Sequence, residues 1–312
     1  MASRKGKAGI KKSFIFIVLF SLFLAVSCFL FRNGIISEDI FLSTKKDIPK
    51  LSENEAEICF LDLWQSESIL IRTKEKTILI DAGEIGYGDD IKAFLKSRNI
   101  KNIDLLVLTH PHSDHIGSAE DIISDFVVKE VLLPDIPEES QPEIKLYDDL
   151  LYAVKCEKAV LTLARPGMKY DFENGAEFEV LGPVSDYETD YNNWSIVGKF
   201  TIGEKSFLFT GDQETEAESD LLNSGANISC DVLKIGHHGS SSSSSSVFLN
   251  EASPEYAVIL CGKGNDYGHP HKNTITALYD RKIKVLRTDL DGDISFITDG
   301  KTLSFFTENG VA

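Results

Sequence analysis

The stretch that decides the fold is LTHPHSDHIG, residues 108–117, which follows an apolar run typical of a strand. In an extended segment alternate side chains share a face, so His110 and His112 lie on one side. The turn that follows brings Asp114 and His115 back beside them. Imidazole and carboxylate groups together suit zinc, manganese or iron. The H-x-H-x-D-H pattern therefore predicts a site for one or two transition-metal ions at a strand tip.

Two further strand-like runs end in residues that bind metals. FLFTGD (residues 207–212) ends in Asp212, and VLKIGHHG (residues 232–239) contains the pair His237 and His238. A pair of ions needs a bridging carboxylate and more ligands than the first motif supplies. We therefore expect three strand tips to converge on one site.

Short apolar runs alternate with amphipathic stretches after residue 57, which predicts strands interleaved with helices. This alternation is typical of an α/β protein with two sheets packed face to face and helices outside. The expected strands cover residues 58–63, 68–73, 77–81, 103–109, 127–133, 176–181, 195–202, 206–210, 231–235, 256–261, 284–288, 294–298 and 302–307, and the expected helices 89–98, 118–125, 144–156, 214–223 and 274–282. The serine run at 240–246 is interpreted as a polar active-site loop, with an interdomain linker as the alternative.

The charge of the chain is strongly acidic and unevenly distributed. The formal net charge of the 312 residues is −17, although residues 1–32 contain six basic side chains and no acidic one. The remainder therefore carries 26 basic against 49 acidic residues, a net charge of −23. Such a body repels the phosphates of a duplex, which excludes tight non-specific binding to double-stranded DNA. A bound divalent metal reverses the sign locally.

An apolar run of 18 residues without a charge, residues 14–31, follows five basic residues. The run is just long enough to cross a bilayer, and the preceding positive charges predict that the N-terminus stays in the cytoplasm. We predict a membrane anchor in residues 1–32, with a secretory signal ending at a lipidated Cys28 as the alternative. Residues 33–56 are interpreted as a stalk, and residues 57–312 as the folded domain outside the cell membrane.

These motifs together resemble the metallo-β-lactamase superfamily, and specifically the hydrolase domain of the ComEC competence proteins. The resemblance extends over about residues 59–307 and implies an αββα sandwich with a metal site at one edge. Its segments are IDAG (80–83), LTHPHSDHIG, NNWS (192–195), FTGD (209–212), LKIGHHGS (233–240), NDYGHPH (265–271) and RTDLDGD (287–293). One departure is WQSE at residues 64–67, where the competence proteins have G-Q-G-D.

The resemblance implies two divalent metal ions, zinc or manganese. The implied metal ligands are His110, His112, Asp114, His115, Asp212 and His238. Under this assignment Asp212 bridges the two ions, and His238 is favoured as a ligand over His237, which is assigned to the substrate. Such ions lower the pKa of a shared water, and Asp114 is expected to orient the resulting hydroxide for catalysis.

The resemblance also suggests residues that contact the substrate. No histidine lies between residues 116 and 236, where many superfamily members supply one. The first ion is therefore expected to have an open position near Asn193 and Ser195, which are assigned to substrate binding. His271 is expected to donate a proton to the leaving group and His269 to bind the substrate, with a purely structural loop as the alternative.

The function implied is that of a phosphodiesterase, most specifically a nuclease acting on single-stranded DNA outside the cytoplasmic membrane. ComEC proteins carry a many-helix channel and this chain has one apolar segment, so uptake would require a separate channel protein. The alternatives are hydrolysis of phosphorylcholine or another small ester on wall polymers, hydrolysis of lactams or lactones, and a non-catalytic metal-binding module. A nuclease should present basic or aromatic side chains around its cleft. The candidates beside the motifs are Lys234, Lys263, Lys272, Trp194 and Tyr267.

Overall fold

The computed structural model describes residues 48–310, and Lys50–Ala312 form one compact unit by themselves. The predicted anchor or signal and most of the predicted stalk fall outside the described residues. Across residues 48–310, no helix combines the length and the apolar character that a membrane crossing requires.

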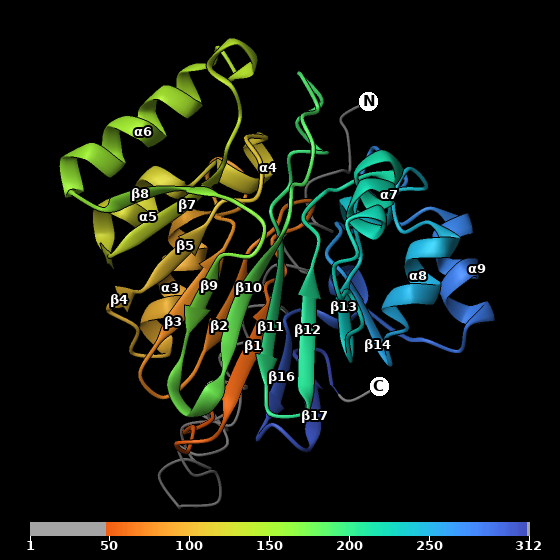
Figure 1. The fold of residues 1–312 in the computed structure, drawn as a ribbon. Helices are drawn as coiled ribbons and strands as arrows, with labels where there is room; N and C mark the ends of the chain where they lie inside the picture. Colours follow the sequence, from red (N-terminus) through yellow and green to blue (C-terminus); the bar gives the residue numbers. More distant parts are fainter. Residues whose placement is uncertain (1–47, 311–312) are drawn as a thin grey trace, which may run out of the picture. The chain divides into compact units, whose positions relative to one another are not determined.

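Two large sheets form the centre of this unit (Figure 1). The first has eight strands in the order β17-β16-β1-β2-β3-β5-β7-β8, and the second has seven in the order β15-β14-β13-β12-β11-β10-β9. The first sheet contains β1 (Ala56–Phe60), β2 (Ile69–Arg72), β3 (Thr77–Ile80), β5 (Leu105–Val107), β7 (Glu130–Pro134), β8 (Val160–Ala164), β16 (Ile294–Thr298) and β17 (Leu303–Thr307). The second contains β9 (Lys169–Asp171), β10 (Glu177–Gly182), β11 (Val197–Ile202), β12 (Lys205–Phe209), β13 (Val232–Lys234), β14 (Tyr256–Ile259) and β15 (Lys284–Arg287). The short strands β4 (Asn102–Ile103) and β6 (Val127–Val128) pair with each other.

The inner faces of the two sheets meet in an aromatic and aliphatic core. Phe60 and Phe296 of the first sheet and Phe207 of the second are fully buried there. The rings of Phe207 and Phe296 meet edge to face with centroids 6.0 Å apart, an arrangement that adds to the free energy gained by burial. This core fixes the two sheets against each other, so the strand tips at its ends have defined relative positions.

Helices cover the outer face of each sheet, as expected from the alternation of the sequence (Figure 1). Each presents one apolar stripe to its sheet, for example Ile91 and Leu95 of α3, which are buried. On the first sheet lie α3 (Gly88–Ser97), α5 (Ala119–Asp125) and α6 (Lys145–Glu157), and on the second α7 (Thr215–Asn223), α8 (Ser246–Ala252) and α9 (Lys272–Asp280). The expected sandwich of two sheets between two helical layers is confirmed. Two short helices, α4 (Ser113–Ile116) and α10 (Thr288–Asp291), follow strand ends.

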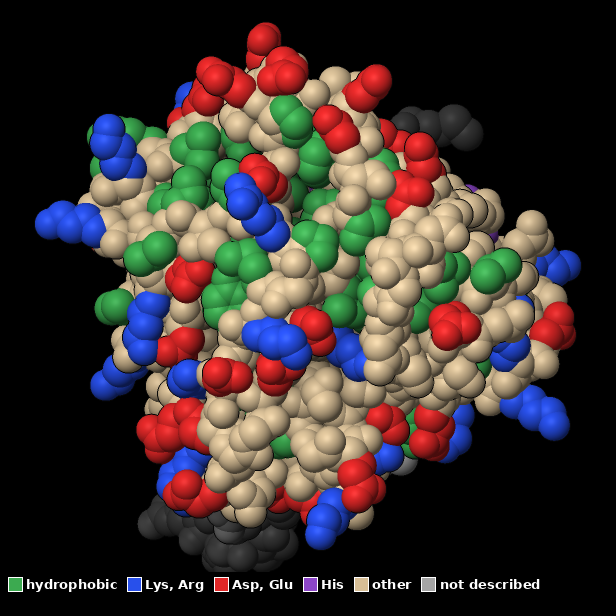
Figure 2. All heavy atoms as spheres, viewed as in Figure 1, with side chains coloured by type: hydrophobic (Ala, Val, Ile, Leu, Met, Phe, Trp, Pro, Cys, Tyr) green, Lys and Arg blue, Asp and Glu red, His purple; other side chains and the backbone are tan. Residues whose placement is uncertain are grey.

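The strands β8 and β9 and the helix α8 were not predicted. β8 is the outermost strand of the first sheet, and its residues Val160, Leu161 and Leu163 are 59%, 44% and 42% exposed. Figure 2 shows exposed hydrophobic side chains on the face that carries α6 and β8. Only Ala164 of β8 is buried. Apolar side chains therefore lie on both faces of this edge strand, which lacks the alternation of polar and apolar residues that identifies a half-buried strand in a sequence.

Candidate metal centre

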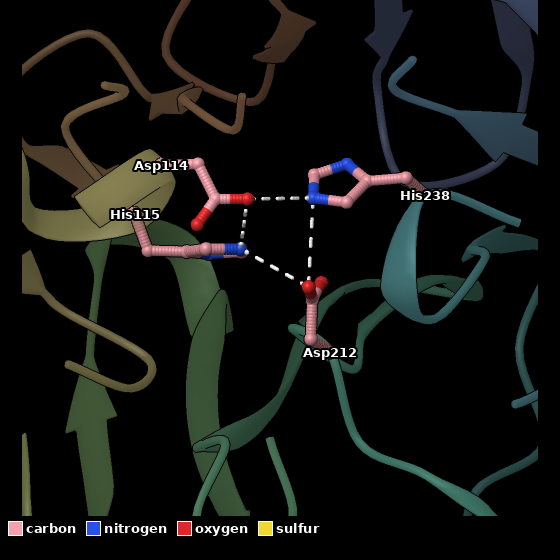
Figure 3. A group of neighbouring side chains, drawn as sticks. All are labelled: Asp114, His115, Asp212 and His238. Atoms are coloured by element: carbon pink, nitrogen blue, oxygen red, sulfur yellow. Dashed lines mark hydrogen bonds and ion pairs between the residues drawn. The ribbon is translucent and has the colours of Figure 1, made fainter. Parts of the chain in front are cut away.

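Loops from both sheets meet at one end of the sandwich. α4 follows β5 of the first sheet and carries Asp114 and His115. Asp212 follows β12, and His238 lies in a short 3-10 helix after β13. β12 and β13 are parallel neighbours, so their carboxyl ends lie at the same edge of the second sheet. The three strand tips therefore converge, as the sequence predicted, and their side chains point toward a common centre (Figure 3).

Four of these side chains form a compact group of ligand atoms. Oδ2 of Asp114 lies 3.1 Å from Nε2 of His238, and Nε2 of His115 lies 3.3 Å from Oδ2 of Asp212. Nε2 of His238 is 3.5 Å from the same Asp212 oxygen. One ligand atom from each of the four residues lies within 4.8 Å of every other. Two imidazole nitrogens and two carboxylate oxygens at this spacing suit a single divalent transition-metal ion.

Neighbouring groups orient both imidazoles for this purpose. Nδ1 of His115 lies 2.7 Å from Oδ2 of Asp81, and Nδ1 of His238 lies 2.9 Å from the backbone oxygen of Leu260. A proton on Nδ1 satisfies each contact and leaves Nε2 with a free lone pair facing the centre. Nε2 of His115 is buried and has no hydrogen-bond partner within residues 48–310. A buried nitrogen left in this state is what a metal ligand requires, so the residues present fit a divalent ion.

The carboxylates of the centre are held in their charged form. Burial opposes ionisation of Asp114, but the charge of His115 and the hydrogen bond with His238 keep its pKa below the usual range. For Asp212, burial is outweighed by His238, His115 and Lys234, which keep the pKa well below its usual value. Burial and the neighbouring His115 lower the pKa of His110, so its imidazole is neutral. Burial lowers the pKa values of His115 and His238, but the charge of Asp212 and the neighbouring carboxylates more than offset this and raise both, so these imidazoles are protonated in the metal-free protein. Metals bind ionised carboxylates and neutral imidazoles, so an ion bound here would release these protons.

The two oxygens of Asp212 have different partners. Oδ2 faces His115 and His238, whereas Oδ1 lies 3.4 Å from Nζ of Lys234. Lys234 is fully buried, contacts the carboxylate of Glu67, which is also fully buried, and donates to the backbone oxygen of Gly211 at 2.6 Å. Burial lowers the pKa of Lys234, but Glu67 and Asp212 more than offset this, so its ammonium is charged. The lysine thus fixes one carboxylate oxygen and leaves the other for the centre.

The proposed DNA contact of Lys234 is therefore wrong, because its side chain is enclosed in this ion pair and does not reach the surface. Gly211, which precedes Asp212, allows the close packing needed here. An added Cβ at Gly211 would lie 2.8 Å from Oγ of Ser195, and its φ is +50°. Only glycine fits that position without displacing the loop.

His110 and His112 form a second, smaller group. Nε2 of His110 lies 3.0 Å from Nδ1 of His112. Among the described residues, neither belongs to a group of three or more mutually close ligand atoms. His110 is buried, whereas His112 is partly exposed beside Tyr191, with ring centroids 6.0 Å apart. The pair would supply two ring nitrogens to a second ion. With two protein nitrogens, that ion keeps the open coordination position that the sequence predicted.

Asn193 and Ser195 were assigned to the substrate, but the structure places both behind the centre. Ser195 is fully buried, its Oγ accepts a hydrogen bond from the backbone N–H of Asp212 at 2.9 Å, and it lies 3.3 Å from Nδ1 of His110. Asn193 is also buried. Its side-chain nitrogen donates a hydrogen bond to Asp190, and its Oδ1 accepts one from the backbone N–H of Glu214. Neither side chain is free to contact a substrate, so both are corrected to positioning residues.

His237 lies on the wall of the cleft. Its Nδ1 is 3.0 Å from Oε1 of Glu214, and its Nε2 is 3.9 Å from Oδ2 of Asp212. The hydroxyl of Ser242 and the amide of Asn192 donate to the same Glu214 oxygen at 2.9 and 3.3 Å. Part of the serine run thus lies against the site, which favours the loop interpretation over the linker. His237 has a φ of +48°, a strained conformation that is common at functional sites.

His269 and His271 lie in two different environments. His269 lines the cleft, and the side-chain amide of Gln65 donates to its Nδ1 at 3.2 Å. Burial and the nearby His237 lower the pKa of His269 to about 4. His271 is absent from the cleft lining. The backbone N–H of Ser241 donates to its Nδ1 at 2.9 Å, and its Nε2 lies 3.3 Å from the backbone oxygen of Tyr267. Both ring nitrogens are engaged, so the role expected of His271 in proton donation is not supported.

The cleft above the centre has a volume of about 330 Å³. Its lining residues are Gln65, His112, Ser113, Asp114, Asn192, Asp212, His237, His238, Tyr267 and His269. No lysine or arginine is among them, so the predicted contacts of Lys263 and Lys272 do not line the cleft. Trp194 is also excluded, because it is buried and its indole N–H donates to the backbone of Glu188 at 3.0 Å. Of the five candidates, only Tyr267 reaches the cleft.

Sequence reasoning missed several residues that shape the site. Glu67, Glu214 and Leu260 were not assigned from a motif, and Asn192 lies in NNWS, where only its neighbours Asn193 and Ser195 were assigned. The roles of all four depend on contacts between distant segments. The one available signal was the departure WQSE from the G-Q-G-D pattern, since Gln65 and Glu67 both prove to contact site residues.

Comparison with known proteins agrees with this fold and ligand set. The sequence matches the metallo-beta-lactamase superfamily over residues 61–263, and the chain belongs to that superfamily. It is 32% identical over 261 residues to ComE operon protein 3 of Bacillus subtilis (strain 168), covering 78% of this chain and 33% of that protein. It is 34% identical over 248 residues to competence protein ComA of Neisseria gonorrhoeae, covering 78% of this chain and 32% of that protein.

The predicted resemblance to the superfamily and to the competence proteins is thereby confirmed. The chain spans about a third of the length of these two relatives. Among solved structures, CmlA, a diiron beta-hydroxylase from Streptomyces venezuelae, superposes with a TM-score of 0.52 at 13% identity, over 77% of this chain and 53% of that chain. This likeness concerns the fold alone. The superfamily consists mostly of metal-dependent hydrolases, often with two divalent ions.

Proposed function

We propose that the chain is a metal-dependent phosphodiesterase that cleaves single-stranded DNA outside the cytoplasmic membrane. The observation that carries the proposal is the group Asp114, His115, Asp212 and His238, whose ligand atoms lie within 4.8 Å of one another and three of whose members line an open cleft. Similarity to two competence proteins supports DNA as the substrate. The acidic surface is compatible with single strands bound at one local site rather than with duplex bound along a surface.

The described residues suggest how two zinc or manganese ions would be held. Asp114, His115, Asp212 and His238 would hold one ion, while His110 and His112 would offer nitrogens to a second. Bound ions supply an activated water and polarise the phosphoryl group. The chain's own residues orient this centre: Asp81 and Leu260 fix the two imidazoles, and Lys234 fixes Asp212.

The test uses the purified full-length chain, stripped of metal and resupplied with manganese or zinc, and end-labelled single-stranded DNA. We expect metal-dependent cleavage that Asp114→Ala abolishes. Asp280→Ala, an exposed aspartate at the end of α9, is the matched control and should cleave like the wild type. If the wild type binds metal, as elemental analysis would show, and yet leaves the DNA intact, the nuclease proposal is refuted.

A second candidate is hydrolysis of a small phosphodiester on wall polymers, such as phosphorylcholine. The observation that favours it is the absence of lysine and arginine from the cleft lining, since nuclease grooves commonly carry positive charge along the backbone path. Release of phosphorylcholine or choline from a wall-polymer fragment, with no cleavage of DNA, would establish this function instead.

The proposal includes a location and partners. The basic, apolar N-terminal segment would anchor the enzyme, or be a cleaved signal, with the catalytic domain on the outer side of the membrane. A separate channel protein would then carry the DNA across. Protease added to intact cells should degrade residues 57–312 if this topology holds, whereas protection of the domain would contradict it.

A further inference from the structure

A column of three aromatic rings leads from the metal centre to the surface. The rings of His238 and His269 are stacked with centroids 6.4 Å apart and 23° between their planes. Tyr267 is stacked on His269 in turn, at 5.7 Å and 19°. Tyr267 lines the cleft and is 68% exposed. Its ring is therefore the most exposed member of the column, because His238 is buried and His269 is partly buried.

The loop that carries Tyr267 is built around one buried side chain. The amide nitrogen of Asn265 donates to the backbone oxygens of Gly262 and His269 at 2.8 and 2.6 Å. Its Oδ1 accepts from the backbone N–H groups of Tyr267 and His269 at 3.1 and 3.0 Å. All hydrogen-bonding capacity of the Asn265 side chain is used inside the loop. The ring of Tyr267 is thus presented on a fixed backbone, which reduces the entropy lost when a ligand binds.

Trp64 supports the same loop from another side. Its indole ring packs on Gly262, where an added Cβ would lie only 2.4 Å from the ring. Gly262 also donates its backbone N–H to Oε1 of Gln65 at 3.0 Å, and Gln65 contacts His269. The loop is therefore fixed to the segment that begins at Trp64 by packing and by hydrogen bonds.

The chemistry of the cleft defines what this surface would recognise. A phosphodiester chain cannot be held there by lysine or arginine, because none lines the cleft. Proteins that bind single strands without sequence preference also stack bases on aromatic side chains, since every base has a π face. Bases in a duplex are stacked on one another, so only an unpaired base is free to stack on a protein ring. A cavity of about 330 Å³ falls in the range of small-ligand sites.

We propose that Tyr267 forms a nucleobase-binding subsite beside the metal centre. An unpaired base stacks on its ring and extends the column His238–His269–Tyr267, while the adjoining phosphodiester reaches the ligand group. This inference rests on the proposed function and names the part of the substrate that provides the binding energy. The recognised class is the unpaired base of a single-stranded nucleic acid, independent of its sequence.

The test measures binding without cleavage. Full-length protein carrying Asp114→Ala is the parent, and fluorescence anisotropy reports its affinity for a labelled single-stranded oligonucleotide. Tyr267→Ala removes the binding free energy that stacking of one base provides. This variant should therefore bind the oligonucleotide about 5- to 150-fold more weakly than the parent. Tyr267→Phe keeps the ring and should bind like the parent. Tyr279→Ala removes another exposed tyrosine, on α9 and 64% exposed, and should also have no effect.

A second measurement identifies the group that stacks. Oligonucleotides in which the bases are replaced by abasic sugars should bind the parent as weakly as the normal oligonucleotide binds Tyr267→Ala. Combining Tyr267→Ala with the abasic ligand should then cause no further loss. Since the abasic comparison uses the unaltered loop, it still decides the question if Tyr267→Ala fails to fold.

Three results would overturn the inference: unchanged binding by a folded Tyr267→Ala, full retention of affinity by the abasic ligand, or Tyr267-dependent binding of wall-polymer sugars with none of DNA. A different result separates this inference from the proposed function. If base-dependent binding to Tyr267 is observed but the metal-loaded wild type cleaves no DNA, the subsite stands and the nuclease proposal fails.

Discussion

The fully buried ion pair of Lys234 and Glu67 allows a quantitative prediction about stability. Lys234→Met keeps the apolar stem of the side chain and removes the ammonium that contacts Glu67 and Asp212. Glu67 would be left fully buried without its cation. Removing one partner of a buried pair costs about 3–5 kcal/mol of unfolding free energy, because an uncompensated charge remains. We expect Lys234→Met to lose stability in this range in urea titrations of the metal-free protein.

The double variant Glu67→Met, Lys234→Met tests the cause. Replacing a buried ion pair by apolar residues of similar volume is often neutral or stabilising, so the double variant should recover most of the stability lost in Lys234→Met. It should not recover metal affinity, because Oδ1 of Asp212 still lacks its cation. Stability and metal affinity would thus respond differently to the same second substitution.

A surface pair provides the control. Nζ of Lys284 lies 2.9 Å from Glu255, and the two side chains are 61% and 53% exposed. Lys284→Met should therefore leave the urea midpoint unchanged within error. The reasoning is refuted if Lys234→Met is as stable as the wild type, or if the double variant is no more stable than Lys234→Met.

Three further outcomes concern metal affinity, metal-linked stability and pH. Asp81→Asn removes the charge that holds Nδ1 of His115, so metal affinity should fall about 10- to 100-fold; equal affinity in competition with a fluorescent chelator would contradict this. Metal at 100 times its dissociation constant should raise the unfolding free energy by about 2.7 kcal/mol, and identical urea midpoints with and without chelator would argue against a site in the native state. Burial raises the pKa of Glu218 in the folded protein above its unfolded value. The folded state therefore holds this proton more tightly, and the stability that results should be lost as pH rises above about 4 and Glu218 ionises. In the presence of chelator, Glu218→Gln should lose less stability than the wild type as pH rises above about 4; equal slopes would exclude this group as the cause.

The parts of the fold that were predictable are those with a local signal. Buried strands such as β5 and β14 are continuous apolar runs, and α3 shows one apolar stripe, so each was placed within a few residues. β8 was missed because its exposed edge has no alternation, and α8 because the serines before it suggested only a loop. Ser245 in fact caps α8, its Oγ accepting from the N–H of Phe248 at 3.3 Å.

The ligand group was predictable for a related reason. His110, His112, Asp114 and His115 are close in sequence, and Asp212 and His238 end apolar strands, so residue type and position indicated the chemistry. The roles of Asn193, Ser195 and His271 were not predictable, because they depend on which way each side chain turns after its loop closes. A sequence shows that a polar residue lies near a motif, but not whether its hydrogen bonds are already satisfied by the protein.

The metal centre is one of several contacts outside the apolar core that join the two sheets; another is the ion pair of Lys234 and Glu67. Asp114 and His115 follow β5 of the first sheet, whereas Asp212 and His238 follow β12 and β13 of the second. Their ligand atoms remain within 4.8 Å only while the sheets keep their present alignment. Metal affinity therefore depends on how the two sheets are aligned. A substitution in the distant phenylalanine core that lets one sheet slide over the other would weaken metal binding without changing any ligand residue.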